Sequence, residues 1–312
     1  MLPVAGIPML ARKLAHLAEH GVTEAVLSLG YKPDAFLAAF PTGEAAGVRL
    51  HYAVEPSPLD TAGAIRFAAQ SAGYLDSDDP EPIVAVNGDV LTTLDLAAQL
   101  AFHRNVGARA TIALTQVEDP SAFGVVPCET DGRVIAFVEK PARDEAPTDW
   151  INGGTYVLDP SVIGSIPANE RISIERVIFP ALVLEGSLYA VHSPTPWIDA
   201  GIPSTYLQAN LDAIPSDSPR AGHVDASAQI HENAVVEHSV IGAGCVVADG
   251  AVVRRSVLLA GATVASGAVV EDSMLGEVAQ VLAGAHISAL SVVGDGAIVE
   301  AGAVLVDARF PS

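Results

Sequence analysis

Apolar residues recur with two different spacings along the first two thirds of the chain. In residues 7–21 they fall at Leu10, Leu14 and Leu17, which is helical spacing, and Gly21 is a natural C-terminal stop. The same patterns predict helices over residues 62–73 and 94–107, and strands over 24–30, 48–54, 83–89 and 108–117. This alternation of strand and helix predicts an α/β domain with a mostly parallel sheet and helices on both faces.

The last third has another texture, in which small residues alternate with Val and Ile. Serines recur at positions 239, 256, 273 and 291, which are 17, 17 and 18 residues apart, and aliphatic residues recur every six. Three short strands of about six residues make one coil of a parallel β-helix, with one aliphatic side chain pointing inward from each side. A disordered low-complexity tail is the alternative, but it would not keep aliphatic residues in phase. We therefore predict inward side chains at Ile241, Val247, Val253 and Leu258.

A segment rich in Pro and Ser separates the two textures. The strand–helix alternation stops near residue 212, and IPSDSPRAG follows at residues 214–222. We predict a first domain over 1–212, a linker over 213–222 and a β-helix over 223–312. Because β-helices expose strand edges at their ends, a homo-oligomer through this domain is expected.

Composition narrows the range of partners. The chain has 312 residues, of which 50% are hydrophobic, and its net charge of −21 opposes binding to nucleic acid or anionic membrane. Any anionic substrate must therefore meet locally concentrated cations, and the only lysines are Lys13, Lys32 and Lys140. Two separated cysteines, Cys128 and Cys245, make neither a disulfide framework nor a zinc site. With no apolar run of membrane-spanning length and no secretion signal, a cytoplasmic protein is predicted.

The buried strand IVAVNGD ends in a glycine and a carboxylate, Gly88 and Asp89. Asn-Gly-Asp is a turn former, which is the simplest explanation. The alternative is a ligand site, because sites in open α/β sheets form beyond the carboxyl ends of strands. A carboxylate there, beside a glycine that lets the backbone come close, suits a metal that carries a phosphate.

Other short segments offer polar groups with both structural and functional explanations. FVEKP holds Glu139 and Lys140. These residues can form a surface ion pair, or Lys140 can be a cation that binds a phosphate. WINGGTYVL holds Asn152, a turn residue or a reader of hydroxyl groups beside glycines that leave room for a ligand. PWIDAG holds Asp199, a turn residue or a second carboxylate that shares one divalent cation with Asp89.

Two further segments begin predicted helices. EPSPLDTAGAI can be an ordinary loop in which Thr61 is the N-cap of the following helix. Alternatively, its small residues leave room for a flat ring to lie against the backbone. ISIERVIFPAL predicts a helix with Ser173 as N-cap and Glu175 in its first turn, where the helix dipole favours an acid.

The order of these motifs resembles a known family. PLDTAGA, VNGD, FGVV, FVEKP, INGGTYVL, IERVIFP and WIDAG occur in sequence and are followed by six-residue repeats. This set resembles the sugar-1-phosphate nucleotidyltransferases, and most closely the mannose-1-phosphate guanylyltransferases. The resemblance implies a Rossmann-like catalytic domain followed by a left-handed parallel β-helix of hexapeptide repeats.

The resemblance also implies roles for individual residues. Asp89 and Asp199 would hold Mg²⁺, and Lys140 would act with Asp89 in catalysis. Contacts to the sugar 1-phosphate would come from Glu139, Lys140, Asn152, Glu175 and Gly124. Contacts to the nucleotide would come from Leu59, Thr61, Ala62, Gly63 and Gly88.

The reaction implied is nucleotidyl transfer, most simply from GTP to mannose 1-phosphate with release of pyrophosphate. Alternatives within the class are transfer from dTTP, UTP or ATP to glucose 1-phosphate. A non-catalytic regulatory homologue is a second alternative. A β-helix acyltransferase is a third, for which His286 is the candidate histidine.

Two departures from the family pattern stand out. Asp60 stands where the family usually has the glycine of Leu-Gly-Thr, although a positive φ would strain a non-glycine residue and a carboxylate beside a nucleotide is unexpected. Family members also begin with a strand and a glycine-rich loop, whereas this chain opens MLPVAGIP, with Met1 at an internal methionine of the family pattern. We therefore expect the 312-residue chain to be inactive as written, with a misplaced start codon favoured over a degenerate homologue.

Overall fold

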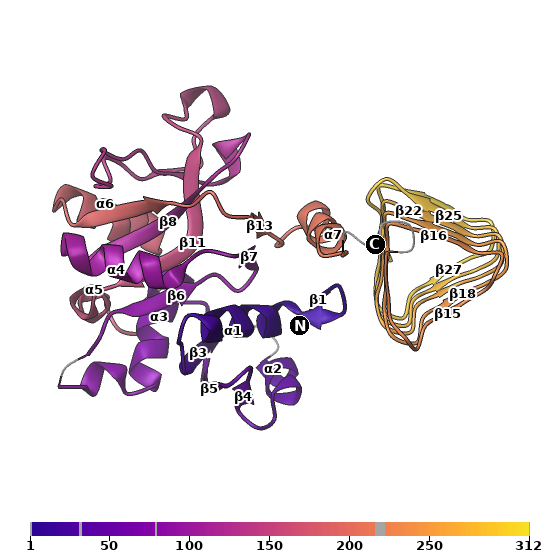
Figure 1. The fold of residues 1–312 in the computed structure, drawn as a ribbon, viewed down its shortest axis with the longest axis horizontal. Coiled ribbons are helices and arrows are strands. Elements are labelled where there is room, and N and C mark those ends of the chain that lie inside the picture. The colour runs from indigo at the N-terminus through magenta and orange to yellow at the C-terminus, as the bar shows by residue number, and fades with distance from the viewer. Residues whose placement is uncertain (1, 31–32, 79, 216–221, 312) are drawn as a thin grey trace. The chain divides into compact units, whose positions relative to one another are not determined.

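The computed structural model describes residues 2–30, 33–78, 80–215 and 222–311 (Figure 1). Its contacts divide the chain into two compact units, one of residues 10–197 and one of residues 2–9 and 198–312. The described residues do not include residues 216–221 of the predicted linker. They also do not include Met1, on which the expectation of an inactive chain rests. The predicted domain limits stay a prediction.

The main sheet of the first unit is built around one long strand, β11 (Trp150–Leu158). β11 runs antiparallel to β6 and to β8, so β6 and β8 share a direction, and β12 is parallel to β8. Three of these four strands therefore run the same way, and the antiparallel insertion of β11 is the feature that the alternation pattern did not predict. The other strands of this sheet are β6 (Ile83–Val86), β8 (Ala110–Gln116), β9 (Gly124–Val125), β10 (Val138–Glu139) and β12 (Leu188–His192).

A second, three-stranded sheet forms from the segment before the main sheet. β3 (Glu24–Leu29) is parallel to β5 (Val48–Val54), and β5 is antiparallel to β4 (Glu44–Ala45). The predicted strands over 24–30 and 48–54 are thus confirmed, and the structure shows that they pair with each other. β7 (Val90–Thr92) follows β6 after a short turn.

Helices cover both sides of the strands, and alternate residues of β6 show why. Ile83 and Ala85 pack into one apolar cluster, whereas Val84 and Val86 pack into another. The first cluster takes side chains from α3, α5 and α6, and the second takes side chains from α1 and α4. The helices of the first unit are α1 (Met9–Glu19), α2 (Pro33–Ala39), α3 (Asp60–Ser71), α4 (Leu96–Val106), α5 (Pro160–Ser165) and α6 (Phe179–Leu184), with 3₁₀ turns at Tyr74–Asp76, Pro120–Ala122 and Arg143–Glu145 and a π-helix at Ile174–Ile178.

The second unit begins with a hairpin that packs on a helix from far along the sequence. β1 (Pro3–Val4) pairs antiparallel with β2 (Ile7–Pro8), and α7 spans Pro203–Asp212. The Ala5 amide donates to Asn210 Oδ1 over 3.0 Å. The Tyr206 hydroxyl donates to the Pro3 carbonyl. The buried Asn210 therefore joins the two ends of the predicted first domain.

The rest of the second unit is a parallel β-helix whose strands stack in three walls (Figure 1). Each strand pairs in parallel with the strand one coil later, as in the register of Ile241 with Leu258. One wall holds β14 (His223–Val224), β17 (Val240–Ile241), β20 (Val257–Leu258), β23 (Met274–Leu275), β26 (Val292–Val293) and β29 (Arg309–Phe310). The second holds β15 (Gln229–Ile230), β18 (Val246–Val247), β21 (Thr263–Val264), β24 (Gln280–Val281) and β27 (Ile298–Val299). The third holds β16 (Val235–Glu237), β19 (Val252–Arg254), β22 (Val269–Glu271), β25 (His286–Ser288) and β28 (Val304–Val306).

The inward aliphatic side chains are those that the six-residue phase predicts. Ile241, Val247, Val253 and Leu258 are all at most 1% exposed, which confirms their predicted orientation. The spacing before the last repeated serine is 18 residues because the turn before it contains one extra residue. Ala289 and Leu290 both take positive φ in this turn. His286 is exposed on β25.

The repeated serines form a hydrogen-bonded ladder inside the β-helix. Ser239, Ser256, Ser273 and Ser291 are fully buried. The Ser256 hydroxyl accepts a hydrogen bond from the Ser273 amide over 3.1 Å and donates to the Arg254 carbonyl over 2.6 Å. The hydroxyls of Ser239, Ser256 and Ser291 thus each accept a hydrogen bond from a backbone amide of the next coil.

Replacing Ser256 with Ala is expected to lower the free energy of unfolding by about 1–3 kcal/mol, because the buried Ser273 amide would lose its acceptor. Chemical denaturation followed by circular dichroism measures the change. Ser266→Ala is the matched control on an exposed corner, with an expected change within about 0.5 kcal/mol. Equal effects of the two substitutions would contradict the ladder.

Candidate functional site

The turn after β6 presents the predicted carboxylate to solvent. The Asn87 amide donates to the Gly154 carbonyl over 2.8 Å, which anchors the turn to β11. Gly88 and Asp89 follow and are exposed. Among the described residues, the Asp89 carboxylate has no hydrogen-bond or ion-pair partner. Its oxygens are therefore available to a cation, and the metal role of Asp89 stays a prediction.

A buried lysine lies next to this turn. Lys13 on α1 is 9% exposed, and its ammonium group donates to the Val90 carbonyl over 2.5 Å. Burial lowers the pKa of Lys13 to about 8, and the charge of Asp89 opposes that shift. We predicted no specific role for Lys13 from the sequence alone. The signal was present, because Lys13 stands on the apolar stripe of α1 between Leu10 and Leu17.

The strands β9, β10 and β11 bring the predicted sugar-binding residues together. Glu139 is the cross-strand partner of Gly124, and the next residue along β9 pairs with Ile151, the neighbour of Asn152. A side chain on Gly124 would lie 2.5 Å from the Phe137 ring, so glycine is required at this position. Lys140 follows with a positive φ of 49° and an exposed side chain.

A hydrogen-bonded pair lies at the centre of these residues. The Asn152 side-chain amide donates to the Tyr156 hydroxyl over 2.9 Å, and its carbonyl oxygen accepts from the Gly154 amide over 3.0 Å. Burial is the largest cause of a raised pKa of Tyr156, and the bond with Asn152 opposes it. The charges of Glu175, Glu139 and Asp89 also raise that pKa. The three predicted site carboxylates therefore act on the pKa of this hydroxyl group in the same direction as burial.

The two glycines of this strand serve contacts within the protein. The pairing of β11 with β8 shifts register between Asn152 and Tyr156. A side chain on Gly153 would lie 2.8 Å from the Ala113 carbonyl oxygen, and one on Gly154 would lie 2.7 Å from Asn87 Nδ2. The space that the sequence analysis assigned to a ligand is thus filled by the backbone of β8 and by the turn that carries Asp89.

Gly154→Ala is expected to destabilise the fold by about 2–4 kcal/mol, from a left-handed backbone and the overlap with Asn87. Gly73→Ala is the matched control, because both glycines have a φ of 70° and Gly73 has open space around it. The control is expected to lose only about 1–2 kcal/mol. Thermal unfolding measures both, and equal losses would show that the Asn87 contact contributes nothing.

The predicted nucleotide loop is joined to the segment 170–175 by backbone hydrogen bonds. The Ala62 and Gly63 amides donate to the Ile172 carbonyl over 2.9 and 3.2 Å, and the Ile172 amide donates to the Leu59 carbonyl over 2.9 Å. The α3 N-cap is Leu59 and not Thr61, because the helix begins one residue before Thr61. A side chain on Gly63 would lie 2.4 Å from the Glu170 carbonyl oxygen, so the small residues here permit a close chain approach.

Polar side chains add to this junction. Glu175 accepts hydrogen bonds from Thr61 over 3.3 Å and from Ser173 over 2.7 Å. Ser173 accepts from the Arg176 amide, which confirms it as the N-cap of the helical turn. Asp60 has a positive φ of 56°, and its carboxylate accepts from Arg171 Nε and Nη2 over 2.9 and 3.2 Å. The unexpected carboxylate is therefore held by a two-point ion pair.

Asp199 ends β13 (Trp197–Asp199) in the second unit. One of its carboxylate oxygens accepts from the Gly201 amide over 2.8 Å, so the turn role considered from the sequence is present. Its convergence with Asp89 stays a prediction. Mg²⁺ typically takes one or two carboxylates and completes its shell with water and substrate phosphates, and the free oxygens of Asp89 fit that chemistry. Within the described ranges, no three His, Cys, Asp or Glu side chains cluster as a ready-made metal site.

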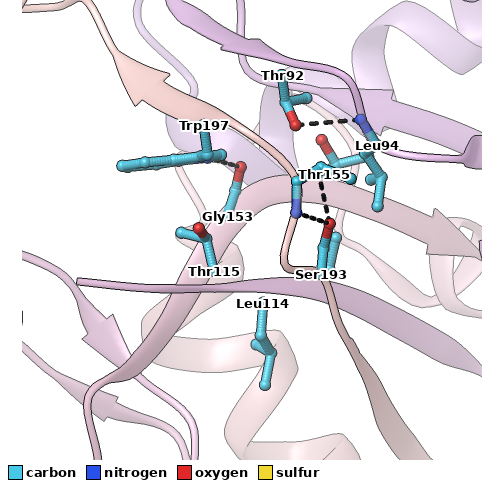
Figure 2. A pocket seen from close by; sticks show the side chains of 10 residues that line it. Thr92, Leu94, Leu114, Thr115, Gly153, Thr155, Ser193 and Trp197 are labelled. Atoms are coloured by element: carbon cyan, nitrogen blue, oxygen red, sulfur yellow. Dashed lines mark hydrogen bonds between the residues drawn. The ribbon is translucent and has the colours of Figure 1, made fainter.

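A small pocket lies beside the double glycine and contains none of the predicted site residues (Figure 2). The Trp197 indole donates to the Gly153 carbonyl over 2.9 Å at one side of it. Ser193 and Thr195 share a hydrogen bond of 2.7 Å at another. The lining consists of Thr92, Leu94, Ala113, Leu114, Thr115, Gly153, Thr155, Ser193, Thr195 and Trp197.

Comparison with protein families identifies both parts of the chain. Residues 1–215 match the nucleotidyl transferase family, and residues 220–310 match the GMPPB C-terminal domain. The chain belongs to the nucleotidyl transferase family. The predicted family resemblance and fold class are thereby confirmed. No described helix is long and apolar enough to cross a membrane.

Individual relatives agree with this assignment. A mannose-1-phosphate guanylyltransferase of Mycobacterium tuberculosis is 38% identical over 252 residues, which cover 79% of this chain and 68% of the relative. Mannose-1-phosphate guanylyltransferase 1 of Arabidopsis thaliana is 34% identical over 255 residues, with the same coverages. The chain thus spans about two thirds of the length of these relatives.

Solved structures share the fold. HddC from Yersinia pseudotuberculosis complexed with GMP-PN has a TM-score of 0.57 and 27% identity, and covers 68% of this chain and 88% of its own. A putative glucose-1-phosphate thymidylyltransferase from Bacillus anthracis has a TM-score of 0.58 and 23% identity, covering 68% and 85%. The second likeness is one of fold alone.

Proposed function

We propose that this protein joins GTP and mannose 1-phosphate to form GDP-mannose and pyrophosphate with Mg²⁺. The observation that carries the proposal is the strand pairing that places Glu139 opposite Gly124 on β9, next to the strand that holds Asn152, together with the exposed Asp89 carboxylate, which is unpaired among the described residues. Relatives named mannose-1-phosphate guanylyltransferase support the substrate pair. The solved relative complexed with GMP-PN supports a guanine nucleotide.

The proposed reaction needs little acid–base help. An oxygen of the sugar phosphate attacks the α-phosphorus of GTP in line, the bond to the bridging oxygen breaks, and pyrophosphate leaves with that electron pair. Because the nucleophile is already an anion, catalysis consists of positioning the two phosphates and neutralising their charge. In a chain of net charge −21, that task falls to a few local cations.

The site residues divide this task. Asp89 and Asp199 would hold Mg²⁺, which when bound neutralises charge on the nucleotide phosphates. The exposed Lys140 would contact the phosphate of the sugar. Asn152 keeps one N–H free of its bonds to Tyr156 and Gly154, and that N–H would donate to a sugar hydroxyl.

The remaining sugar and nucleotide contacts are proposed on the adjoining segments. Glu139 and Glu175 would accept hydrogen bonds from sugar hydroxyls, next to the backbone of Gly124. Gly88 and the loop over residues 59–63 would receive the nucleotide. Because Arg171 neutralises Asp60, the carboxylate in that loop does not repel the triphosphate as a free charge would.

Two alternatives follow from the same site. Transfer from dTTP, UTP or ATP to glucose 1-phosphate uses the same phosphate chemistry. A non-catalytic homologue that binds a nucleotide sugar without turnover is favoured by Asp60, which replaces a glycine of the base loop. Association of several chains through the β-helix stays a prediction.

The test measures pyrophosphate release by the full chain with Mg²⁺, each of GTP, dTTP, UTP and ATP, and each of mannose and glucose 1-phosphate. Release confined to GTP with mannose 1-phosphate would support the proposed reaction and contradict the expectation that the 312-residue chain is inactive. Release with another pair would replace the substrates. Binding of GDP-mannose in calorimetry without release by any pair would favour the non-catalytic homologue.

A further inference from the structure

Lys13 is a charged residue in an apolar position. On α1 it follows Leu10 by three residues and precedes Leu14 and Leu17, which are buried in the core. Its ammonium group reaches the Val90 carbonyl over 2.5 Å. One neutral acceptor replaces only part of the hydration that an ammonium loses on burial. An apolar side chain would fill the position without that loss.

The bond from Lys13 acts at the residue that follows Asp89. Three residues further along α1, the His16 ring hydrogen-bonds the Leu94 carbonyl over 2.9 Å. Two side chains of α1 therefore hold the backbone at the start of β7 and just after its end. Only Lys13 also brings a positive charge that acts on Asp89.

We propose that Lys13 is a positioning residue for Asp89, which fixes the turn through Val90 and places a positive charge beside the proposed metal-binding carboxylate. The inference rests on the proposed metal role of Asp89. The charge of the ammonium weakens the attraction of the Asp89 carboxylate for a free divalent cation. The site thereby favours a cation that arrives with a phosphate-bearing nucleotide over a cation alone.

This arrangement has a signature that a purely structural lysine lacks. Loss of a structural residue disorders the turn and weakens cation binding. Loss of a neighbouring positive charge strengthens cation binding by the same carboxylate. The sign of the change in affinity therefore separates the two roles.

The experiment is a titration of the full chain with Mn²⁺ alone, followed by electron paramagnetic resonance, with melting temperatures measured in parallel. Lys13→Gln retains a donor for the Val90 carbonyl and removes the charge, and Lys13→Met removes both. We expect Lys13→Gln to bind Mn²⁺ about 3–10 times more tightly than the natural chain. Lys13→Arg should restore the natural affinity, and both neutral variants should melt at or above the natural temperature.

Two controls complete the design. His16→Leu removes the other bond from α1 to the segment around β7, and its Mn²⁺ affinity should be unchanged. Adding Asp89→Asn to Lys13→Gln should abolish the gain. Unchanged or weaker Mn²⁺ binding by a folded Lys13→Gln variant would overturn the positioning role of Lys13 but not the metal role of Asp89. Absence of binding by the natural chain at millimolar Mn²⁺ would overturn the metal role of Asp89 and this inference with it.

Discussion

Replacing Asp89 with Asn is expected to reduce turnover at least about 100-fold, because the variant keeps the shape of the turn and removes the charge that binds the cation. Asp89 is exposed and has no hydrogen-bond or ion-pair partner among the described residues, so the substitution breaks no such contact of the fold. The measurement is the rate of pyrophosphate release as a function of Mg²⁺ concentration. The loss should be accompanied by weaker binding of Mn²⁺.

The control for Asp89 is Glu118→Gln, which removes one negative charge from another exposed position of the same unit. Its turnover should stay within about twofold of the natural value, because exposed charges interact weakly through water. If the two variants had equal rates, Asp89 would be only a turn residue.

Lys140→Met is expected to lower kcat/KM for the sugar phosphate about 100-fold. The side chain keeps its length, but the charge that would neutralise the attacking phosphate is lost. The backbone amide of Lys140 donates to the Phe123 carbonyl over 3.0 Å, and this bond does not depend on the side chain. The stability of the fold should therefore be unaffected, and initial rates over a range of sugar phosphate concentrations measure the effect.

Arg143→Gln is the matched control for Lys140. It removes a cation three residues away whose guanidinium lies 3.6 Å from Asp119 in an exposed ion pair. Because such pairs contribute little, its kinetics should match the natural chain. A Lys140→Met variant with unchanged kcat/KM would show that Lys140 is an ordinary surface cation.

The positions of several predicted site residues follow from strand pairing that the sequence does not display. Gly124, Glu139 and Asn152 come from segments separated along the chain, and the β10–β9–β11 order places them on neighbouring strands. Periodicity identifies a strand but carries no information on its neighbour. The antiparallel direction of β11 escaped prediction for the same reason.

The sequence indicated which glycines allow a close approach, but not which atoms approach them. The double glycine after Asn152 suggested room for a ligand, whereas Gly153 and Gly154 instead admit the β8 backbone and Asn87. A glycine in a sequence shows that a side chain is not tolerated or not needed. Which atoms come close depends on segments that are distant in the chain.

The sequence by itself determined the β-helix almost completely. Each coil packs on its neighbour, so the contacts between coils repeat with the period of the sequence. The six-residue phase predicts the buried Ile241, Val247 and Val253, and the 17-residue serines become the ladder between coils. The sequence also determined the family of the first unit, because each of its motifs is a short continuous segment. Only the tertiary structure decided that Lys13 reaches Val90, 77 residues away, and that Arg171 neutralises Asp60, 111 residues away. Long-range contacts of this kind depend on how helices and strands pack, and packing geometry is not encoded in any local pattern.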